Sequence, residues 1–225
     1  VKIQRLSTGI GGLDRATGGG VPFGSALLVA GAPGTGKTTF MLQMLMRCAA
    51  SGVRCAYLAP FTEPIEGVLA AASTFRFMDR EVFTRQVEFY DLADAIYRKE
   101  VDLEGLGRSL GESGVKLVVL DSVTALRHRA DDLGYPSLLR GFIIGARRAG
   151  ATVVMTSEMD EKVIAGTPES SFSDSMIIMQ RTGSGMQKFR YLTILKMRST
   201  KHTLNTLRYE ITAEGLQVYP YLNSN

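Results

Sequence analysis

The segment Gly31–Thr38 (GAPGTGKT) constrains this chain more than any other feature of its sequence. It fits the whole G-x-x-x-x-G-K-[ST] pattern, in which a glycine-rich turn joins a strand to a helix and cradles phosphate groups. The context agrees, because Ala26–Ala30 predicts a buried strand just before the turn and Thr38–Ala50 predicts a helix just after it. The segment therefore predicts an α/β fold with a phosphate site at this junction.

The residues of this turn have separate expected roles. Its glycines let the backbone fold around a phosphate with N–H groups pointing inward, and the start of the helix adds partial positive charge. Lys37 is expected to neutralise the β- and γ-phosphates of ATP, and the Thr38 hydroxyl is expected to bind Mg²⁺. ATP and Mg²⁺ are therefore the predicted cofactors, and the predicted binding residues in this turn are Gly34, Thr35, Gly36, Lys37, Thr38 and Thr39.

A second metal ligand is expected at Asp121. The apolar run Leu117–Leu120 predicts a buried strand, which would deliver the Asp121 carboxylate to the carboxyl edge of the sheet, beside the phosphate turn. Thr38 and Asp121 are therefore the predicted metal ligands. The alternative is that Asp121 caps a following helix, since aspartate is a favoured N-cap residue.

The rest of the chain predicts one domain, residues 1–225, with a single mixed sheet. Up to Ser157 short apolar runs alternate with helix-period stretches, which is typical of a parallel sheet flanked by helices. The further strands expected there are Arg54–Ala59, Val87–Asp91, Lys116–Leu120 and Thr152–Ser157, and the helices are Ile65–Phe77, Leu103–Glu112 and Ser137–Arg148. Residues 158–173 are expected to form a polar loop. The C-terminal third predicts antiparallel strands only, at Ser175–Gln180, Phe189–Met197, Leu207–Thr212 and Leu216–Tyr219.

Composition and charge exclude several classes of protein. The 225 residues are 45% apolar and 21% charged, as in globular proteins rather than disordered ones. The net charge of +4 permits contact with nucleic acid but does not require it. No apolar run approaches the ~18 residues of a membrane span, and the N-terminal residues do not form a secretory pattern. We therefore expect a cytoplasmic protein without a membrane partner.

Three further segments give the chain a resemblance to the KaiC branch of the RecA-like ATPases, from about Ser7 to Tyr219. The first lies ahead of the phosphate turn, the second surrounds Asp121, and the third is a K-M-R-x-x-x-H stretch. They are Ser7–Gly24, Leu120–Leu126 and Lys196–His202. The resemblance implies a RecA-like P-loop fold, ATP hydrolysis, and a homo-oligomer that is expected to be a hexameric ring.

The resemblance also assigns roles to the third segment. Lys196 and Arg198 would contact the γ-phosphate held by a neighbouring subunit, and His202 would lie near the sugar or base. Chemistry supports this, because a cation delivered from outside stabilises the charge that develops in phosphoryl transfer. Residues two apart on a strand point to the same face, so Lys196 and Arg198 are expected to project together. The alternative is a solvated basic edge strand.

The water-activating carboxylate is expected at Glu63. KaiC-like proteins carry a Glu-Glu pair after the second strand, but here that pair aligns with Phe61 and Thr62, and Glu63 follows one place later. The predicted catalytic residues are therefore Glu63, Lys37, Lys196 and Arg198. If Glu63 does not act, the chain would be a slow ATPase or a nucleotide-gated switch. Glu158, which follows the strand Thr152–Ser157, is expected to sense the γ-phosphate.

Three functions remain open on this evidence. The first is a slow ATPase ring with a regulatory or signalling role and a protein partner. The second is a nucleic-acid-dependent ATPase of recombination, with residues 127–136 and 158–173 as the DNA loops; we do not favour it, because these loops carry mixed or acidic charge. The third is a non-catalytic, nucleotide-gated switch, in which ATP sets the oligomer and a partner protein reads it. The resemblance also raises autokinase activity as an alternative, because Ser170 and Ser171 align with the serine-threonine pair that KaiC phosphorylates.

Overall fold

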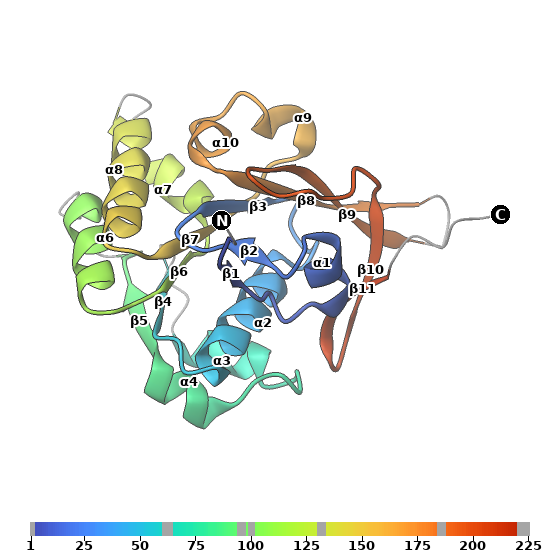
Figure 1. Cartoon of the computed structure of the whole chain (residues 1–225), viewed down its shortest axis with the longest axis horizontal. Coiled ribbons are helices and arrows are strands. Elements are labelled where there is room, and N and C mark those ends of the chain that lie inside the picture. Colours follow the sequence, from blue (N-terminus) through green and yellow to red (C-terminus); the bar gives the residue numbers. More distant parts are fainter. Residues whose placement is uncertain are drawn as a thin grey trace.

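A mixed sheet forms the centre of the computed structural model, which describes residues 3–59, 65–93, 98, 102–129, 134–183 and 188–219. Within these residues the sheet has nine strands in the order β11-β10-β9-β8-β3-β7-β6-β4-β5. Helices cover both of its faces (Figure 1). This arrangement confirms the predicted fold class.

The first part of the sheet is parallel, and all of its strands except the outermost, β5, are buried on both faces. It consists of β3 (Ala26–Ala30), β7 (Thr152–Ser157), β6 (Leu117–Leu120), β4 (Cys55–Ala59) and β5 (Val87–Asp91). Every residue of β3, β4, β6 and β7 is buried, which explains why these strands read as unbroken apolar runs rather than as alternating patterns.

The second part of the sheet is antiparallel and extends it past β3. β8 (Ser175–Thr182) still runs parallel to β3, and β9 (Phe189–Met197) then turns back along it. β10 (Leu207–Thr212) and β11 (Gly215–Tyr219) complete the edge as antiparallel neighbours. β3, which leads into the phosphate turn, therefore lies in the middle of the sheet, with parallel neighbours on both sides.

The sheet divides the apolar side chains into two cores, one between each of its faces and the helices that cover that face. One face is covered by α1 (Gly11–Ala16), α2 (Lys37–Ala50), α3 (Ile65–Ala72) and α4 (Arg80–Gln86). The opposite face carries α6 (Leu103–Glu112), α7 (Val123–Arg129), α8 (Gly134–Arg148), α9 (Glu161–Ile164) and α10 (Pro168–Phe172). Ahead of the sheet, β1 (Arg5–Leu6) pairs with β2 (Val21–Pro22). Among the described helices, none is long and apolar enough to cross a lipid bilayer.

The expectation of a polar loop at 158–173 is wrong, because α9 and α10 lie there. α10 begins with Thr167 as its N-cap, whose hydroxyl accepts a hydrogen bond from the Ser170 N–H at 3.3 Å, and Pro168 follows at the first helical position. A threonine cap followed by proline is a helix start signal, but the helix is too short to build a clear apolar period.

Other boundaries differ for local reasons. The helix expected over Ile65–Phe77 ends at Ala72, where the Ser73 and Thr74 hydroxyls bond back to preceding carbonyls and compete with further helical bonds. α8 begins before the expected Ser137, because a proline is tolerated in a first helical turn. The short helices α1, α4 and α7 were not predicted, since each has only one or two turns.

α6 and α8 pack with unusually close backbones, and glycines make this possible. A Cβ atom on Gly107 of α6 would lie 2.7 Å from the Phe142 carbonyl oxygen of α8. On the other side of the contact, a Cβ atom on Gly145 would lie 2.6 Å from the Glu104 carbonyl oxygen. These distances are well inside normal contact, so any larger residue forces the two helices apart.

We expect Gly107→Ala to destabilise the fold, although alanine is more favourable than glycine within a helix by about 1 kcal/mol. The added methyl group would press on the rigid α8 backbone, at a cost of about 1–3 kcal/mol. Urea denaturation measures the difference. Gly141→Ala is the matched control, because a Cβ atom there meets the flexible Glu104 side chain at 3.2 Å. Equal stabilities of the two variants would contradict the prediction.

Candidate functional site

The phosphate turn joins β3 to α2 with the geometry that its sequence predicts. The Gly31 N–H donates to the Ser157 carbonyl of β7 at 3.1 Å, which attaches the turn to the neighbouring strand. Gly36 has φ of +98° just before α2 begins, in the left-handed region that favours glycine. A Cβ atom there would also lie 2.5 Å from Ile211 Cδ1. The backbone torsion therefore favours glycine, and a larger residue would also displace the end of the Ile211 side chain.

Lys37 lies inside the turn and is only 7% exposed. Its ammonium donates to the carbonyls of Gly31 at 2.9 Å and Ala32 at 3.3 Å. Burial lowers the pKa of Lys37, while the negative charges of Asp121 and Glu158 oppose that shift. Among the described residues Lys37 has no ion-pair partner within 4.0 Å, so the chain holds a buried cation in reach of an anionic ligand.

Asp121 follows β6 at the same edge of the sheet. Its carboxylate accepts hydrogen bonds from the Tyr57 hydroxyl at 2.9 Å and from the Thr156 hydroxyl. Two donors on neighbouring strands therefore fix its orientation. No described hydrogen bond joins this carboxylate to the start of α7, so the alternative role as a helix cap has no support.

The donor set at this edge fits Mg²⁺. The Thr38 hydroxyl, in the first turn of α2, and the Asp121 carboxylate are hard oxygen ligands of the kind that Mg²⁺ takes from proteins. No cluster of three or more His, Cys, Asp or Glu side chains with metal-binding geometry occurs in the described part of the chain. A cation held here would thus take its remaining ligands from phosphate oxygens and water.

Glu158 directly follows β7 and shares this edge. Its backbone N–H donates to the Thr124 hydroxyl of α7 at 2.9 Å, and its side chain is exposed. β6, β7 and β3 are parallel neighbours, so Asp121, Glu158 and the turn that holds Lys37 all follow strands at the same end of the sheet. Glu63, the expected water-activating carboxylate, lies outside the described residues, and its role stays a prediction.

Lys196, Arg198 and His202 lie at a different place in the fold. The Lys196 ammonium donates to the carbonyls of Ser170 at 2.6 Å and Ser173 at 2.8 Å, at the end of α10. Burial lowers the pKa of Lys196, the Arg198 cation adds to this, and Asp174 opposes it. His202 Nδ1 lies 3.0 Å from the Thr200 carbonyl oxygen.

Arg198 does not share a strand face with Lys196 as the two-residue spacing predicted. β9 ends at Met197, and Arg198 and Ser199 form a turn in which Ser199 has φ of +56°. The cations still converge, because Arg198 Nη1 lies 3.6 Å from Asp174 Oδ1, next to the Ser173 carbonyl that Lys196 binds. The two side chains therefore meet at Ser173–Asp174, although Arg198 lies in the turn after β9 and not on the strand.

The two groups of residues lie at opposite ends of the strands of the sheet. The Asp174 N–H donates to the Ala26 carbonyl at the start of β3, whereas the phosphate turn follows Ala30 at its end. Five residues of strand span about 16 Å, more than an arginine side chain can bridge. Arg198 therefore cannot reach the phosphate turn of its own chain.

Several contacts of the site were not predicted from the sequence. Tyr57 and Thr156 hold Asp121, and the Arg181 and Tyr209 side chains donate to the carbonyls of Pro33 and Thr35 in the turn. Tyr57 and Thr156 are polar groups within apolar strands, which is a signal for a buried contact, whereas Arg181 and Tyr209 stand among polar neighbours and carry no such signal. Each partner is distant in sequence, so the sequence did not identify the contact.

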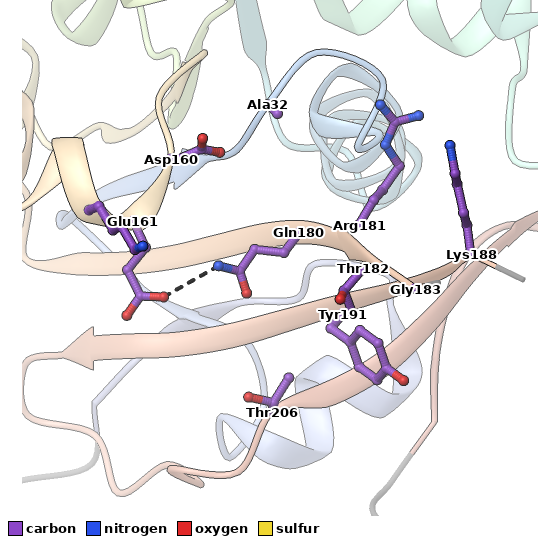
Figure 2. Close-up of a pocket in the computed structure, with 11 residues that line it drawn as sticks. Ala32, Asp160, Glu161, Gln180, Arg181, Thr182, Gly183, Lys188, Tyr191 and Thr206 are labelled. Atoms are coloured by element: carbon purple, nitrogen blue, oxygen red, sulfur yellow. Dashed lines mark hydrogen bonds between the residues drawn. The ribbon is translucent and has the colours of Figure 1, made fainter. Parts of the chain in front are cut away.

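A polar cavity of about 860 Å³ opens beside the turn, between Ala32, the start of α9 and the hairpin of β8 and β9. Figure 2 shows Arg181 and Lys188 rising from the hairpin side, and Gln180 bonded to Glu161 at 3.4 Å on the α9 side. Cations and acids both line it. The cavity leaves the phosphate turn open to solvent on this side.

Comparisons with known proteins agree with this geometry. The family described as "ATPase: KaiC" matches residues 6–223. A UPF0273 protein of Thermotoga maritima is 28% identical, with 97% of both chains covered. The circadian clock oscillator protein KaiC of Parathermosynechococcus lividus is also 28% identical over 97% of this chain, which spans 43% of that longer protein. A crystal structure of a KaiC-like protein from Pyrococcus horikoshii OT3 matches with a TM-score of 0.85 at 25% identity, covering 97% of this chain and 100% of the other.

We expect Asp121→Asn to weaken the contribution of Mg²⁺ to ATP binding. Asparagine keeps the size of the side chain and one acceptor oxygen for the Tyr57 and Thr156 hydroxyls, and its NH₂ group can donate to the other hydroxyl, but it removes the charge that holds the cation. Calorimetric titration with ATP in Mg²⁺ and in EDTA separates the two effects. The gain in affinity on adding Mg²⁺ should fall about tenfold. An unchanged gain would show that Asp121 is not a metal ligand.

Proposed function

This chain belongs to the KaiC family of ATPases, and we propose that it binds Mg-ATP at the junction between two subunits and hydrolyses it slowly. The observation that carries the proposal is the distance between the two halves of the site. The phosphate turn, Asp121 and Glu158 lie at one edge of the sheet, and Lys196 and Arg198 lie near the other. The cations can serve a nucleotide only on another copy of the chain.

This arrangement supports a head-to-tail assembly. A contact between two different surfaces of identical subunits closes into a ring when the rotation between them is suitable. We propose a hexameric homo-oligomer, in which each phosphate turn meets the Lys196–His202 segment of its neighbour. Arg198 is 71% exposed along its side chain, and its pairing with Asp174 at 3.6 Å is a loose one that leaves donors for a second anion.

The chemistry then divides between two chains. The N–H groups of the turn and Lys37 would hold the β- and γ-phosphates, and Thr38 and Asp121 would hold Mg²⁺, which neutralises charge on the phosphate oxygens when bound. Lys196 and Arg198 of the neighbour would stabilise charge that develops on the γ-phosphoryl group. Glu158 would sense that group, His202 would contact the sugar or base, and Glu63 would activate the attacking water.

We further propose a regulatory or signalling role in the cytoplasm, in which ATP sets the assembly and a protein partner responds to it. The relatives named circadian clock oscillator proteins support this class of role. This chain covers less than half of those proteins, 43% of the first and 46% of the second, so it is not proposed as an oscillator by itself.

We expect Arg198→Ala to lower ATP turnover by at least about tenfold while leaving ATP affinity nearly unchanged, because the guanidinium acts on the transition state. Release of labelled phosphate from γ-labelled ATP and a binding titration measure the two quantities. Arg85→Ala is the matched control, since Arg85 is an exposed arginine of α4 that pairs only loosely with Glu81 at 3.7 Å.

A mixing experiment tests the action between chains. Lys37→Ala should remove the subunit's own phosphate site but keep its cations, and Arg198→Ala does the reverse. Each variant alone should be nearly inactive, and co-assembled mixtures should recover part of the turnover, because some junctions then combine an intact Lys37 with an intact Arg198. Normal turnover by Arg198→Ala, or a monomer in saturating Mg-ATP, would contradict the proposal.

Autophosphorylation is the second candidate, supported by the position of the two serines. The Ser170 carbonyl accepts the Lys196 ammonium, so α10 lies at the edge that would face a neighbour's nucleotide. Ser171 is exposed and Ser170 is buried, which makes Ser171 the expected acceptor. Retention of γ-label on the protein, lost in Ser171→Ala, would support this candidate. Unchanged label uptake with both serines replaced by alanine would exclude it.

A further inference from the structure

The outer side of the phosphate turn contacts strands that follow it by more than a hundred residues. The Tyr209 hydroxyl of β10 donates to the Thr35 carbonyl at 2.5 Å. Arg181 Nη2 of β8 donates to the Pro33 carbonyl at 3.2 Å, and the Arg181 side chain rises from β8 toward the turn (Figure 2). Two carbonyls of the turn are thus held outward by side chains of the antiparallel part of the sheet.

Because a peptide unit is rigid, fixing the direction of its carbonyl also fixes the direction of its N–H group. A trans peptide unit is planar, with its C=O and N–H groups pointing in opposite directions. The Thr35 carbonyl shares a peptide unit with the Gly36 N–H, and the Pro33 carbonyl shares one with the Gly34 N–H. Holding these carbonyls against β10 and β8 therefore turns the Gly36 and Gly34 N–H groups toward the opposite side, where phosphate oxygens bind.

Glycine is the residue that most needs such a restraint. Gly34 and Gly36 have φ of +76° and +98°, and glycine rotates between peptide orientations more freely than any other residue. Neither N–H donates a hydrogen bond to another group in the described part of the chain. The contacts of the Thr35 and Pro33 carbonyls are therefore the described interactions that fix the orientation of these two N–H groups.

Tyr209 is well placed to act as a rigid donor. It is 1% exposed and is among the largest fully buried side chains of the described residues. Burial raises its pKa, so the hydroxyl keeps the proton that it donates. Ile211, two residues further along β10, and Met179 of β8 approach the Cβ position of Gly36, which leaves the turn little room to retreat from the strands.

We propose that Tyr209 and Arg181 are positioning residues of the phosphate turn, which hold its peptide units so that the Gly36 and Gly34 N–H groups face a β-phosphate. The inference rests on the proposed function, because it assumes that a nucleotide occupies the turn. It assigns to β8 and β10 a part in ligand binding that acts through the turn, in addition to the place of Arg181 in the lining of the neighbouring cavity. The proposal does not depend on the contacts of the Asp121 carboxylate or of the Lys37 ammonium.

The test is Tyr209→Phe, which removes one oxygen atom and keeps the buried ring. The affinity for ADP should fall about tenfold, as expected for the loss of one well-oriented hydrogen bond to phosphate. The affinity for AMP, whose single phosphate does not need the Gly36 N–H, should stay unchanged in competition titrations. Tyr219→Phe is the matched control, because that hydroxyl bonds only to the exposed Glu210 at 3.3 Å.

A spectroscopic readout separates positioning from general support of the fold. In ¹H–¹⁵N spectra the Gly36 amide signal should shift strongly when ADP binds to the unmodified protein, and the shift should be smaller in Tyr209→Phe. A variant that binds ADP as tightly as the unmodified protein would overturn the inference. So would equal losses of ADP and AMP affinity, because they indicate a general effect on structure.

Arg181→Gln provides a second variant at an exposed position, where folding is not at risk. Its ADP affinity should fall about threefold, less than for Tyr209→Phe, because solvent can replace an exposed donor. Arg208→Gln on β10 is its control, since Arg208 bonds to Glu210 and not to the turn. If the unmodified protein itself fails to bind ADP, the proposed function is wrong. If it binds and both variants match it, only the present inference is wrong.

Discussion

The burial of the Lys37 ammonium within a turn of backbone groups is the interaction on which the rest of the site depends. A cation that is 7% exposed and has no ion-pair partner among the described residues is costly unless dipoles and a ligand compensate it. The carbonyls of Gly31 and Ala32 supply part of that compensation. The same turn must also direct its remaining N–H groups to the ligand. This requires glycine torsions, and it requires neighbouring strands that hold the carbonyls of the turn in place.

The strand order places those neighbouring strands beside the turn. β3 lies between β7 and β8, so the turn that follows it has Asp121 and Glu158 on one side and the antiparallel strands on the other. The same order carries Lys196 and Arg198 to the opposite edge, at Ser170–Asp174. The sheet thus has a phosphate site at one end of its strands and, at the other end, two cations that the phosphate turn of the same chain does not use. This separation favours function through assembly rather than in a single subunit.

Much of this protein was predictable because its signals are local. The parallel strands were predictable from buried apolar runs, and β3, β5, β7, β9 and β10 have the expected bounds. The phosphate turn followed from residues adjacent in sequence. The expectation of a loop at residues 158–173 failed, because the few residues of α9 and α10 carry no clear apolar period. Lys196 and Arg198 do converge, but through a turn at Ser199 and not through a shared strand face.

The sequence by itself determined the class of fold, the phosphate turn and the carboxylate at the end of β6, because each depends on residues within a few positions of one another. Only the tertiary structure decided which groups surround them. Tyr57 and Thr156 meet at Asp121, and Tyr209 meets Thr35 across 174 residues of sequence, since strands far apart in the chain become neighbours in the sheet. The physical reason is that strand order is set by burial of both faces of the whole sheet, a condition that no short segment contains.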